Sequence, residues 1–489
     1  MYSKSRFLTR RLIAATCTVS MVLCSILSLS TSRSLALPNV LFIAVDDLND
    51  WVGFLDGHPQ VRTPNMDRLA ERGIVFSNAH CAAPLCGPSR AALFSGRQPF
   101  HTGVYVNKQQ IRKRHPDLVL LPQHFHTHGY RTLGTGKLMH REFTDMYDES
   151  FFTEQRWSPY VSQEPQSQQE SSRLAMRPLN GMPNDRQQLQ PGTFSSFDWG
   201  AVPVPDDEMG DSKVVRWAAE HLLREADNKK PFFLGCGFYR PHIPLYAPQE
   251  YFDMYPADST ILPEVPADDL NDVNSAAISL AHSIQTGGLH ENVLRHGQWK
   301  EAVAAYMACI SFVDAQIGQL LDALDKGPYA ENTIVVLWSD HGWHLGEKEH
   351  WGKTTGWERA TRVPLVIVPA KTDASNCNCG SQCDETVGLI DLYPTLIEMC
   401  DLPSKAELDG VSLVPQLVDP SMETNRAVVT TVDRGIYSVR DNRWRLIRYA
   451  DGSKELYDHQ QDPNEWVNLA DDVRYLAIKE RLSRSLPDR

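Results

Sequence analysis

The most concentrated chemical signal in the sequence is the segment Cys86-Gly87-Pro88-Ser89-Arg90, which a second Gly-Arg pair follows at residues 96 and 97. Proline suits the first turn of a helix, so the spacing predicts that Cys86 lies at a helix N-terminus. The free backbone N–H groups and the helix dipole at that end favour a developing negative charge. The segment therefore predicts a reactive residue at position 86. A buried or disulfide-bonded cysteine beside a helix cap is the structural alternative.

Acidic residues follow two apolar runs. Asp46-Asp47 comes directly after Asn39–Val45, and Asp340-His341 comes just after Thr333–Trp338. If the two runs are neighbouring parallel strands, these side chains meet at the carboxyl edge of the sheet, where open α/β sheets bind ligands. Carboxylates this close repel one another unless a divalent cation binds between them, and oxygen-rich ligands favour Ca²⁺ or Mg²⁺ over zinc. The alternative is a set of helix-capping aspartates and a solvated histidine.

Further cationic and histidine side chains lie in two loops. The segment Gly134–Lys137 ends an apolar run, so Lys137 and His140 are expected on a loop at a sheet edge. His242 lies in the segment Arg240-Pro241-His242-Ile243-Pro244, whose prolines restrict the backbone and orient the side chain. Histidines have an ordinary pKa of about 6.5, which suits proton transfer. An ordinary surface lysine and a plain loop histidine are the alternatives.

These loops need a scaffold of buried elements. Apolar runs predict strands at 39–45, 74–77, 131–135, 232–238, 333–338 and 363–368, and helical patterns predict helices at 211–224 and 298–325. Strands that alternate with helices indicate an α/β sandwich with a mostly parallel central sheet. The Gln-, Ser- and Pro-rich stretch 155–190 is interpreted as a surface insertion. After a linker at 419–425, short alternating segments predict a C-terminal subdomain at 419–489 with a small antiparallel sheet.

Residues 1–36 differ from the rest of the chain. Four basic residues between positions 4 and 11 precede an apolar stretch, and Ser34-Leu35-Ala36 offers a cleavage site, as in a secretory signal peptide. We therefore expect a signal peptide at 1–36, a catalytic domain at 37–418, and a secreted or periplasmic protein with no membrane contact after cleavage. No N-x-[ST] glycosylation site occurs, which favours a bacterial source. An uncleaved membrane anchor is the alternative.

Composition limits the classes of function. The chain has 489 residues and 48 Lys plus Arg against 61 Asp plus Glu, a formal net charge of −13. This balance argues against a nucleic-acid partner, which needs a basic surface, but a local cationic cleft can still bind an anionic substrate. In an oxidising compartment some cysteines should pair. Cys377, Cys379 and Cys383 lie close together and predict a local disulfide, with a fragment of a zinc site as the alternative.

The segment at Cys86 resembles the signature of the type I sulfatases, of the alkaline-phosphatase-like superfamily, in which the first residue of CxPSR is oxidised to Cα-formylglycine. The resemblance runs from Pro38 to about Leu417. Further motifs are similar to the iduronate-2-sulfatase branch: VDDLND at Val45, GKLMH at Gly136, RPHIP at Arg240 and SDHGWHLGE at Ser339. The resemblance implies an alkaline-phosphatase-like sandwich, a formylglycine-generating enzyme as a partner during maturation, and a bound Ca²⁺.

The resemblance also implies roles for single residues. The metal ligands would be Asp46, Asp47, residue 86, Asp340 and His341, the last standing where many sulfatases have Asn. The positions that hold formylglycine (3-oxoalanine) and sulfate would be Arg90, Lys137 and Lys353. His242 is expected to protonate the leaving group, and His140 to act as a base when sulfate is released.

The expected function is therefore removal of an O-sulfate from a sulfated oligosaccharide or polysaccharide. Arg240, His242, Trp343 and Lys353 offer cationic and aromatic groups, which suggests a 2-O-sulfated uronic acid at a non-reducing chain end. Two alternatives remain. One is a phosphate or phosphonate ester hydrolase of the same superfamily, and the other is a non-catalytic glycan-binding paralogue in which residue 86 stays a thiol.

Overall fold

The computed structural model describes residues 37–140, 144–152, 178–183, 185, 196–224, 230–284, 287–372 and 377–487. The predicted signal peptide at 1–36 lies outside these residues, as does most of the insertion predicted at 155–190. The described residues after Ala36 form one compact unit. The division predicted at residue 418 stays a prediction.

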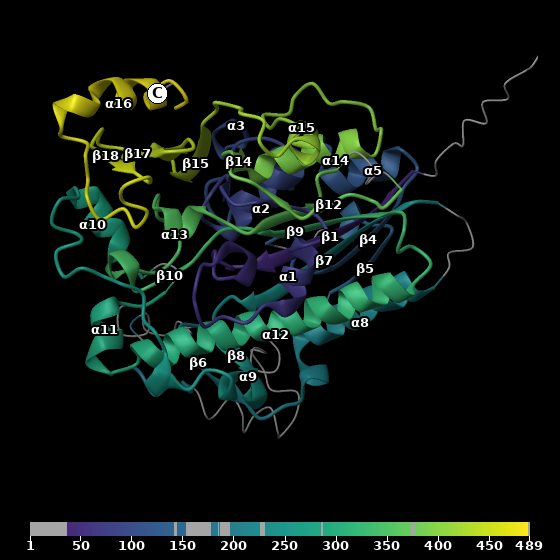
Figure 1. Cartoon of the computed structure of the whole chain (residues 1–489), viewed down its shortest axis with the longest axis horizontal. Coiled ribbons are helices and arrows are strands. Elements are labelled where there is room, and N and C mark those ends of the chain that lie inside the picture. Colours follow the sequence, from purple (N-terminus) through teal and green to yellow (C-terminus); the bar gives the residue numbers. More distant parts are fainter. Residues whose placement is uncertain are drawn as a thin grey trace, which may run out of the picture. The chain divides into compact units, whose positions relative to one another are not determined.

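A mixed, mostly parallel sheet lies at the centre of this unit, as predicted (Figure 1). Its strand order in the described part of the chain is β13-β2-β12-β9-β1-β7-β4-β5. The neighbours β9, β1, β7, β4 and β5 are parallel, whereas β12 runs antiparallel to β9 and to β2. The strands are β1 (Asn39–Asp46), β2 (Ile74–Phe76), β3 (Ala79–His80), β4 (Arg131–Gly136), β5 (Glu149–Phe151), β6 (Trp199–Val202), β7 (Phe232–Pro241), β8 (Leu245–Pro248), β9 (Thr333–Ser339), β10 (His344–Leu345), β11 (Trp351–Gly352), β12 (Leu365–Val368), β13 (Ser381–Cys383), β14 (Val387–Gly388), β15 (Val428–Asp433), β16 (Ile436–Arg440), β17 (Trp444–Arg448) and β18 (Lys454–Asp458).

Helices cover both faces of the sheet. The described helices are α1 (Pro64–Ala70), α2 (Cys86–Ser95), α3 (Pro99–Thr102), α4 (Ile111–Arg114), α5 (Leu121–Thr127), α8 (Gly210–Leu223), α9 (Gln249–Asp253), α10 (Ser275–Ala281), α11 (His290–Arg295), α12 (Trp299–Lys326), α13 (Glu358–Thr361), α14 (Leu392–Met399), α15 (Val414–Val418) and α16 (Leu476–Ser483). Side chains of β1 alternate between two cores: Leu41 and Ile43 pack with α8 and α12, and Val40 and Phe42 pack with α2, α5 and α14. All eight residues of β1 are buried, which explains the uninterrupted apolar run between Asn39 and Asp46.

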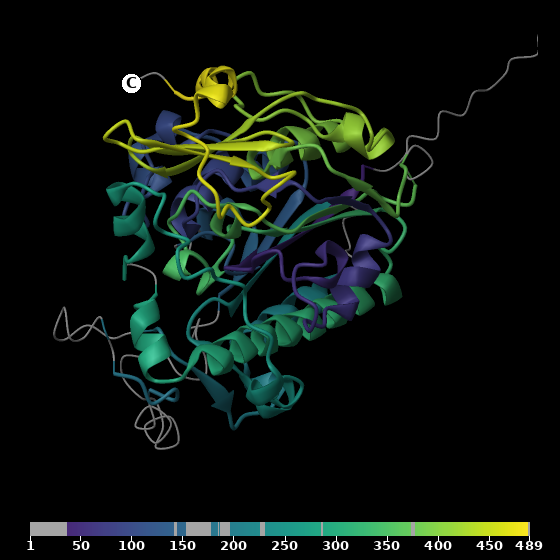
Figure 2. The same ribbon diagram turned by 60° about the vertical axis from the view of Figure 1, so that its left-hand side comes forward.

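The C-terminal antiparallel sheet is also present, with the order β15-β16-β17-β18. Figure 2 shows it in yellow on the α2 side of the central sheet. The backbone N–H of Thr431 donates to the carbonyl of Ala82 (2.8 Å), which ties β15 to the segment before α2. The last strand, Lys454–Asp458, is one that the sequence pattern does not single out.

Among the described helices, α12 alone is long and apolar enough to cross a membrane. However, 89% of its apolar window is buried within the protein, so α12 packs as a core helix. Cys377 and Cys379 form a disulfide, while Cys383 carries a free, buried thiol. The predicted local disulfide therefore joins the first two cysteines of this group.

Candidate active site

The carboxyl ends of β1 and β9 bring the two predicted acidic pairs together. The strands are parallel neighbours, with Val45 of β1 paired with Ser339 of β9. Beyond them the backbone N–H of Asp47 donates to Oδ1 of Asp340 (3.1 Å). Asp47 has a positive φ of 61°, an uncommon conformation for a residue other than glycine, and such strain is concentrated at functional sites. The chain turns here, so that consecutive aspartates both enter the site.

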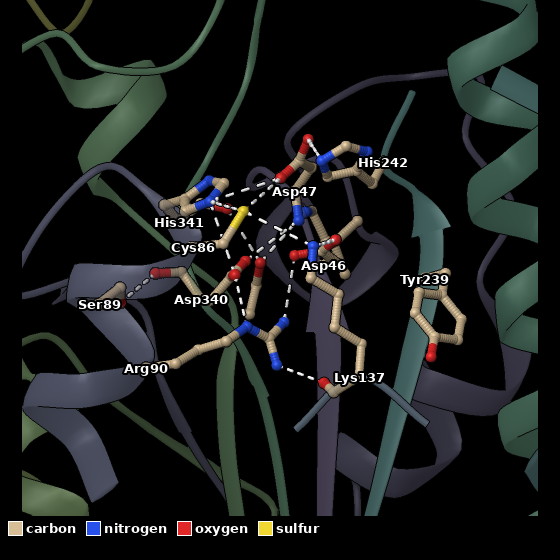
Figure 3. Close-up of polar contacts among 12 residues, drawn as sticks. Asp46, Asp47, Cys86, Ser89, Arg90, Lys137, Tyr239, His242, Asp340 and His341 are labelled. Carbon is tan, nitrogen blue, oxygen red and sulfur yellow. Dashed lines mark hydrogen bonds and ion pairs between the residues drawn. The ribbon is translucent and has the colours of Figure 1, made fainter. Parts of the chain in front are cut away.

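Cys86 is the first residue of α2, as predicted, and is fully buried. Figure 3 shows its sulfur facing His341 and Asp47. The Sγ atom lies 3.0 Å from Nζ of Lys353 and 3.7 Å from Nζ of Lys137. It also lies 3.3 Å from Nε2 of His341 and 3.8 Å from Oδ1 of Asp47. One sulfur atom is therefore the meeting point of side chains from four separate segments.

These neighbours control the ionisation of the thiol. Burial raises the pKa of Cys86, but the positive charges of Lys137 and Lys353 outweigh burial and hold that pKa well below its usual range. Burial likewise opposes a charge on Lys353, while Asp47 and the Cys86 thiolate raise the pKa of its ammonium above the ordinary value. Residue 86 thus lies in a site built to stabilise a negative charge.

Arg90 holds the carboxylates in place from below the cysteine (Figure 3). Its Nε donates to Oδ2 of Asp340 (2.7 Å), and one terminal nitrogen donates to Oδ1 of Asp46 (3.2 Å). The other terminal nitrogen donates to the carbonyls of Lys137 and Leu138. The buried guanidinium therefore orients two acidic side chains and the loop that carries Lys137.

The close approach of β4 and β7 gives Lys137 its position. Gly136 has a φ of 66°, and a Cβ at this residue would lie 1.9 Å from the carbonyl oxygen of Gly237. Only glycine fits this contact. The chain turns inward at Gly136, and Nζ of Lys137 then forms a buried ion pair with Oδ2 of Asp46.

The two histidines predicted to transfer protons make different contacts. His140 forms a side-chain hydrogen bond with Cys86, and burial lowers the pKa of His140. His242 places Nε2 3.8 Å from Oδ2 of Asp47, while its Nδ1 is 2.6 Å from the carbonyl oxygen of Ile243. Donation from Nδ1 to that carbonyl fixes the orientation of the ring. The His242 side chain is 16% exposed, so it stands nearer to solvent than Asp47, which is fully buried.

Four of the predicted metal ligands form one group: donor atoms of Asp46, Asp47, Cys86 and His341 lie within 4.8 Å of one another. Within the described structure, Oδ2 of Asp47 is buried and takes part in no hydrogen bond. A buried carboxylate oxygen without a donor is costly unless a cation is bound to it. Two of these four donors are carboxylate oxygens, the kind of ligand that a hard divalent cation prefers. The fifth predicted ligand, Asp340, borders this group, with Oδ2 3.6 Å from Nε2 of His341 and bonded to Arg90.

Two residues expected to recognise substrate, Arg240 and Trp343, are almost fully buried. Arg240 is 2% exposed and donates to the carbonyls of Tyr246 (2.8 Å) and His242 (3.3 Å). Trp343 is 1% exposed, and its ring lies 5.5 Å from Nζ of Lys353. The structure therefore shows supporting contacts for both side chains, and the expectation that they contact a sugar stays a prediction. Arg240 holds the His242 loop, and Trp343 supports the Lys353 ammonium by a cation–π contact.

The structure also reveals supporting residues that the sequence pattern does not single out. Ser89 donates to the carbonyl of Asp340 (2.5 Å), which ties α2 to the end of β9. The buried carboxylate of Asp211, on the first turn of α8, accepts the backbone N–H groups of Tyr239 (2.8 Å) and Arg240 (3.0 Å). For Ser89, its position within the CGPSR segment was a sequence feature that could have indicated a role in the site. Asp211, which is 28 residues from Tyr239, had no such feature.

Comparison with known proteins identifies two matching family models. A model described as Sulfatase matches residues 38–402, and one described as N-sulphoglucosamine sulphohydrolase, C-terminal, matches residues 346–489. Among curated proteins, a sulfatase of Formosa agariphila is 38% identical and covers 92% of this chain and 86% of its own. Human iduronate 2-sulfatase is 31% identical over 77% of this chain and 67% of its own. A choline-sulfatase of Rhizobium meliloti is 29% identical over 89% and 83%, respectively.

Solved structures show the same fold. A 2-O GAG sulfatase superposes with a TM-score of 0.65 and 24% identity, covering 91% of this chain and 90% of that one. A phosphonate monoester hydrolase from Silicibacter pomeroyi superposes with a TM-score of 0.73 and 21% identity, covering 91% and 94%. A third, solved with its substrate D-glucosamine-2-N,6-O-disulfate, has a TM-score of 0.68 and 21% identity, covering 92% and 96%. At these identities the likeness establishes the fold, while the reaction is inferred from the family and the site.

Proposed function

Because the chain belongs to the sulfatase family and hydrolyses sulfate esters, we propose that its substrate is an O-sulfated carbohydrate. We further propose that the nucleophile is formylglycine made from Cys86, and that Asp46, Asp47, residue 86 and His341 bind Ca²⁺ with Asp340 beside them. The observation that carries this proposal is the environment of Cys86: a buried residue at a helix N-terminus, within 3.8 Å of two ammonium groups, a histidine and an aspartate.

The chain's own residues supply binding, orientation and proton transfer. Lys137 and Lys353 neutralise the charge that develops on the oxygens of the sulfate group. Formylglycine supplies a nucleophile that can be regenerated after sulfate transfer, which a plain thiol cannot. A bound Ca²⁺ supplies additional positive charge to the ester and the nucleophile. His242 protonates the departing sugar oxygen through Nε2, and His140, hydrogen bonded to residue 86, accepts a proton when sulfate leaves.

Mass spectrometry of the peptide that contains residue 86 tests this proposal. Active protein should carry an aldehyde at this position, lighter than the cysteine residue, and Cys86→Ala should abolish turnover while the fold is kept. The host should also contain a formylglycine-generating enzyme. Full activity of the alanine variant, or of protein whose residue 86 is entirely a thiol, would contradict the proposed nucleophile.

A second candidate is hydrolysis of a phosphonate or phosphate ester, because phosphonate monoester hydrolases are among the structures with this fold. Matched sulfate and phosphonate esters with the same leaving group separate the two reactions. We expect the higher kcat/KM on the sulfate ester. The reverse ranking would place the chain with the phosphonate hydrolases in activity as well as in fold. A chain that turns over neither ester would be a glycan-binding paralogue.

For the sugar itself we propose a 2-O-sulfated uronic acid at a non-reducing chain end. This proposal is supported by the similarity to human iduronate 2-sulfatase and by the fold shared with a 2-O GAG sulfatase. The measurement is kcat/KM on a 2-O-sulfo-uronate disaccharide and on a 6-O-sulfo-glucosamine disaccharide. A higher value on the second would overturn the uronate proposal and leave the sulfatase assignment intact.

We also propose that the mature protein begins after Ala36 and acts outside the cytoplasm of a bacterium, as a secreted or periplasmic enzyme. N-terminal sequencing of the exported protein tests the cleavage site. A chain that retains residues 1–36 and stays with the membrane would contradict it.

A further inference from the structure

A basic segment lies directly after the helix that begins at Cys86. No Asp or Glu occurs from Arg72 to Pro116, although the whole chain carries a net charge of −13. The end of this stretch holds Lys108, Arg112, Lys113 and Arg114. A run without acids in an acidic protein creates a local positive potential.

Three of these side chains are available to bind anions. Lys108, Lys113 and Arg114 are exposed, and in the part of the chain that the structure describes none of them forms an ion pair. Arg112 differs, because it donates to the carbonyl of Leu118 (2.8 Å) and lies 3.5 Å from Asp145. It supports the loop, while the other three keep their charges toward solvent.

A fourth exposed cation reaches the same place from the C-terminal sheet. The guanidinium of Arg434, in the turn between β15 and β16, lies over the ring of Tyr105 at 5.2 Å from its centroid. Arg114 and Asp433 also act electrostatically on Tyr105. We call Lys108, Lys113, Arg114 and Arg434 the basic rim. Asp433 and Asp117 are the exposed acids nearest to it along the chain, so the rim keeps a positive balance.

The basic rim borders the reactive centre. Asn107, the residue before Lys108, accepts a hydrogen bond from the backbone N–H of Gly87 (2.8 Å), which follows Cys86 in the chain. Asn107 and Gln110 line a small pocket of about 20 Å³ together with Gly87 and His140. The basic rim therefore lies next to the small pocket that is lined by His140 and by the first turn of α2.

We propose that the basic rim binds sulfate or carboxylate groups of a polyanionic glycan chain while another sulfate of the same chain lies at residue 86. This inference rests on the proposed function and specifies it further. An acidic protein repels a polyanion unless it offers such a surface. Tyr105 adds an aromatic ring, and amide groups next to the cations suit sugar hydroxyls. The substrate is then a chain with several anionic units, in contrast to a small sulfate ester of the kind named for the choline-sulfatase relative.

Binding to a heparin hexasaccharide tests the rim without turnover. The full-length Cys86→Ala protein is compared with the same protein carrying Lys108→Gln, Lys113→Gln and Arg114→Gln. A matched control carries Arg216→Gln, Arg295→Gln and Lys326→Gln, which remove the same charge from helices α8, α11 and α12. We expect the rim variant to raise Kd roughly tenfold at low ionic strength, because three exposed ion pairs are lost, and the control to change it little.

High salt should remove the difference in Kd between the Cys86→Ala protein and the rim variant, because salt screens exposed charges. An unchanged Kd in the rim variant, an equal loss in the control, or tighter binding of single-stranded DNA of equal charge than of the hexasaccharide would overturn the proposal.

A second measurement separates the rim from the chemistry. With Cys86 intact, the rim variant should keep the wild-type kcat/KM on a small aryl sulfate and lose activity on the sulfated oligosaccharide through a higher KM. An equal loss on both substrates would contradict a binding role. If the wild type hydrolyses no sulfate ester, the proposed function fails, whereas the hexasaccharide Kd still decides the rim.

Discussion

Every carboxylate around Cys86 already contacts a cationic side chain before any metal is considered. The three carboxylates of Asp46, Asp47 and Asp340 contact three cationic side chains. These cations are Arg90, Lys137 and Lys353. Repulsion between carboxylates, the argument available from the sequence, is therefore not the reason for a metal. The reason is the buried Oδ2 of Asp47, which no N–H or O–H group of the described residues satisfies.

Metal removal gives the first prediction at this scale. Chelation should abolish activity and lower the melting temperature, and Ca²⁺ should restore both better than Zn²⁺, because carboxylate oxygens are among the donors. A ligand that binds only the folded state at 100 times its Kd adds about 2.7 kcal/mol to the free energy of unfolding. Thermal denaturation over a Ca²⁺ titration measures this gain. Asp47→Asn should remove most of the gain, and a variant that still responds fully to Ca²⁺ would contradict the ligand assignment.

His242 gives a prediction about leaving groups. Loss of a general acid costs roughly 10²–10⁴-fold when the departing oxygen needs a proton. His242→Ala should therefore impair hydrolysis of alkyl sulfates far more than hydrolysis of activated aryl sulfates, whose phenolate leaves without protonation. The measurement is kcat/KM over a series of sulfate esters that differ in leaving-group pKa. A uniform loss along the series would assign His242 a role in binding instead.

At the level of secondary-structure elements, the side chain of Asp211 joins the start of α8 to the end of β7. Burial raises the pKa of Asp211 to about 6, although Arg240 and two backbone N–H groups favour the ionised form. For an acid whose pKa is higher in the folded protein, the protonated form stabilises the fold. The stabilisation that the protonated carboxyl adds to the free energy of unfolding is fully present below pH 3.8. It is lost as the pH rises towards 6. Asp211 therefore positions the His242 loop at a cost in stability near neutral pH.

Asp211→Asn tests this link, because asparagine cannot ionise. Between pH 4 and pH 7 the wild type should lose up to about 3 kcal/mol of unfolding free energy relative to the variant. Urea denaturation at several pH values gives the difference between the two proteins. A difference that does not change with pH would show that Asp211 has an ordinary pKa in the folded protein.

The strand ends could be predicted from sequence, whereas the supporting contacts could not. Asp46 and Asp340 come at the ends of apolar runs that predict buried strands, and the parallel pairing of those strands brings both carboxylates to one sheet edge. Cys86 was placed at a helix start by Pro88. The antiparallel direction of β12 and the burial of Arg240 depend on contacts between distant segments, which no local pattern encodes.

For the whole molecule, the C-terminal sheet stabilises the segment that carries Lys353. Nε1 of Trp357 donates to Glu455 of β18 (2.9 Å). The buried Arg445 of β17 pairs with Glu358 of α13 and, at 2.6 Å, with Glu465. The C-terminal strands and the catalytic segment are thus joined by ion pairs centred on a fully buried arginine.

Arg445→Met should accordingly destabilise the whole protein. Removing one partner of a buried ion pair typically costs about 3–5 kcal/mol, because the remaining charges stay buried without compensation. Arg443→Met, which removes a half-exposed arginine paired with Asp458, is the matched control and should cost much less. Chemical denaturation of both variants measures the difference. Equal losses would show that the C-terminal sheet contributes little to holding α13.

The complete burial of Cys86 has a consequence for when the protein can be matured. Once α2 has packed against β1, the thiol can no longer enter the active site of another enzyme, so the oxidation to formylglycine that we propose must compete in time with folding. Slow folding leaves the segment accessible for longer, and rapid folding traps the thiol permanently. The relative rates of oxidation and folding then determine the fraction of active molecules in a preparation. That fraction should rise when the modifying enzyme is present during synthesis, and adding the same enzyme to the folded, purified chain should not change it.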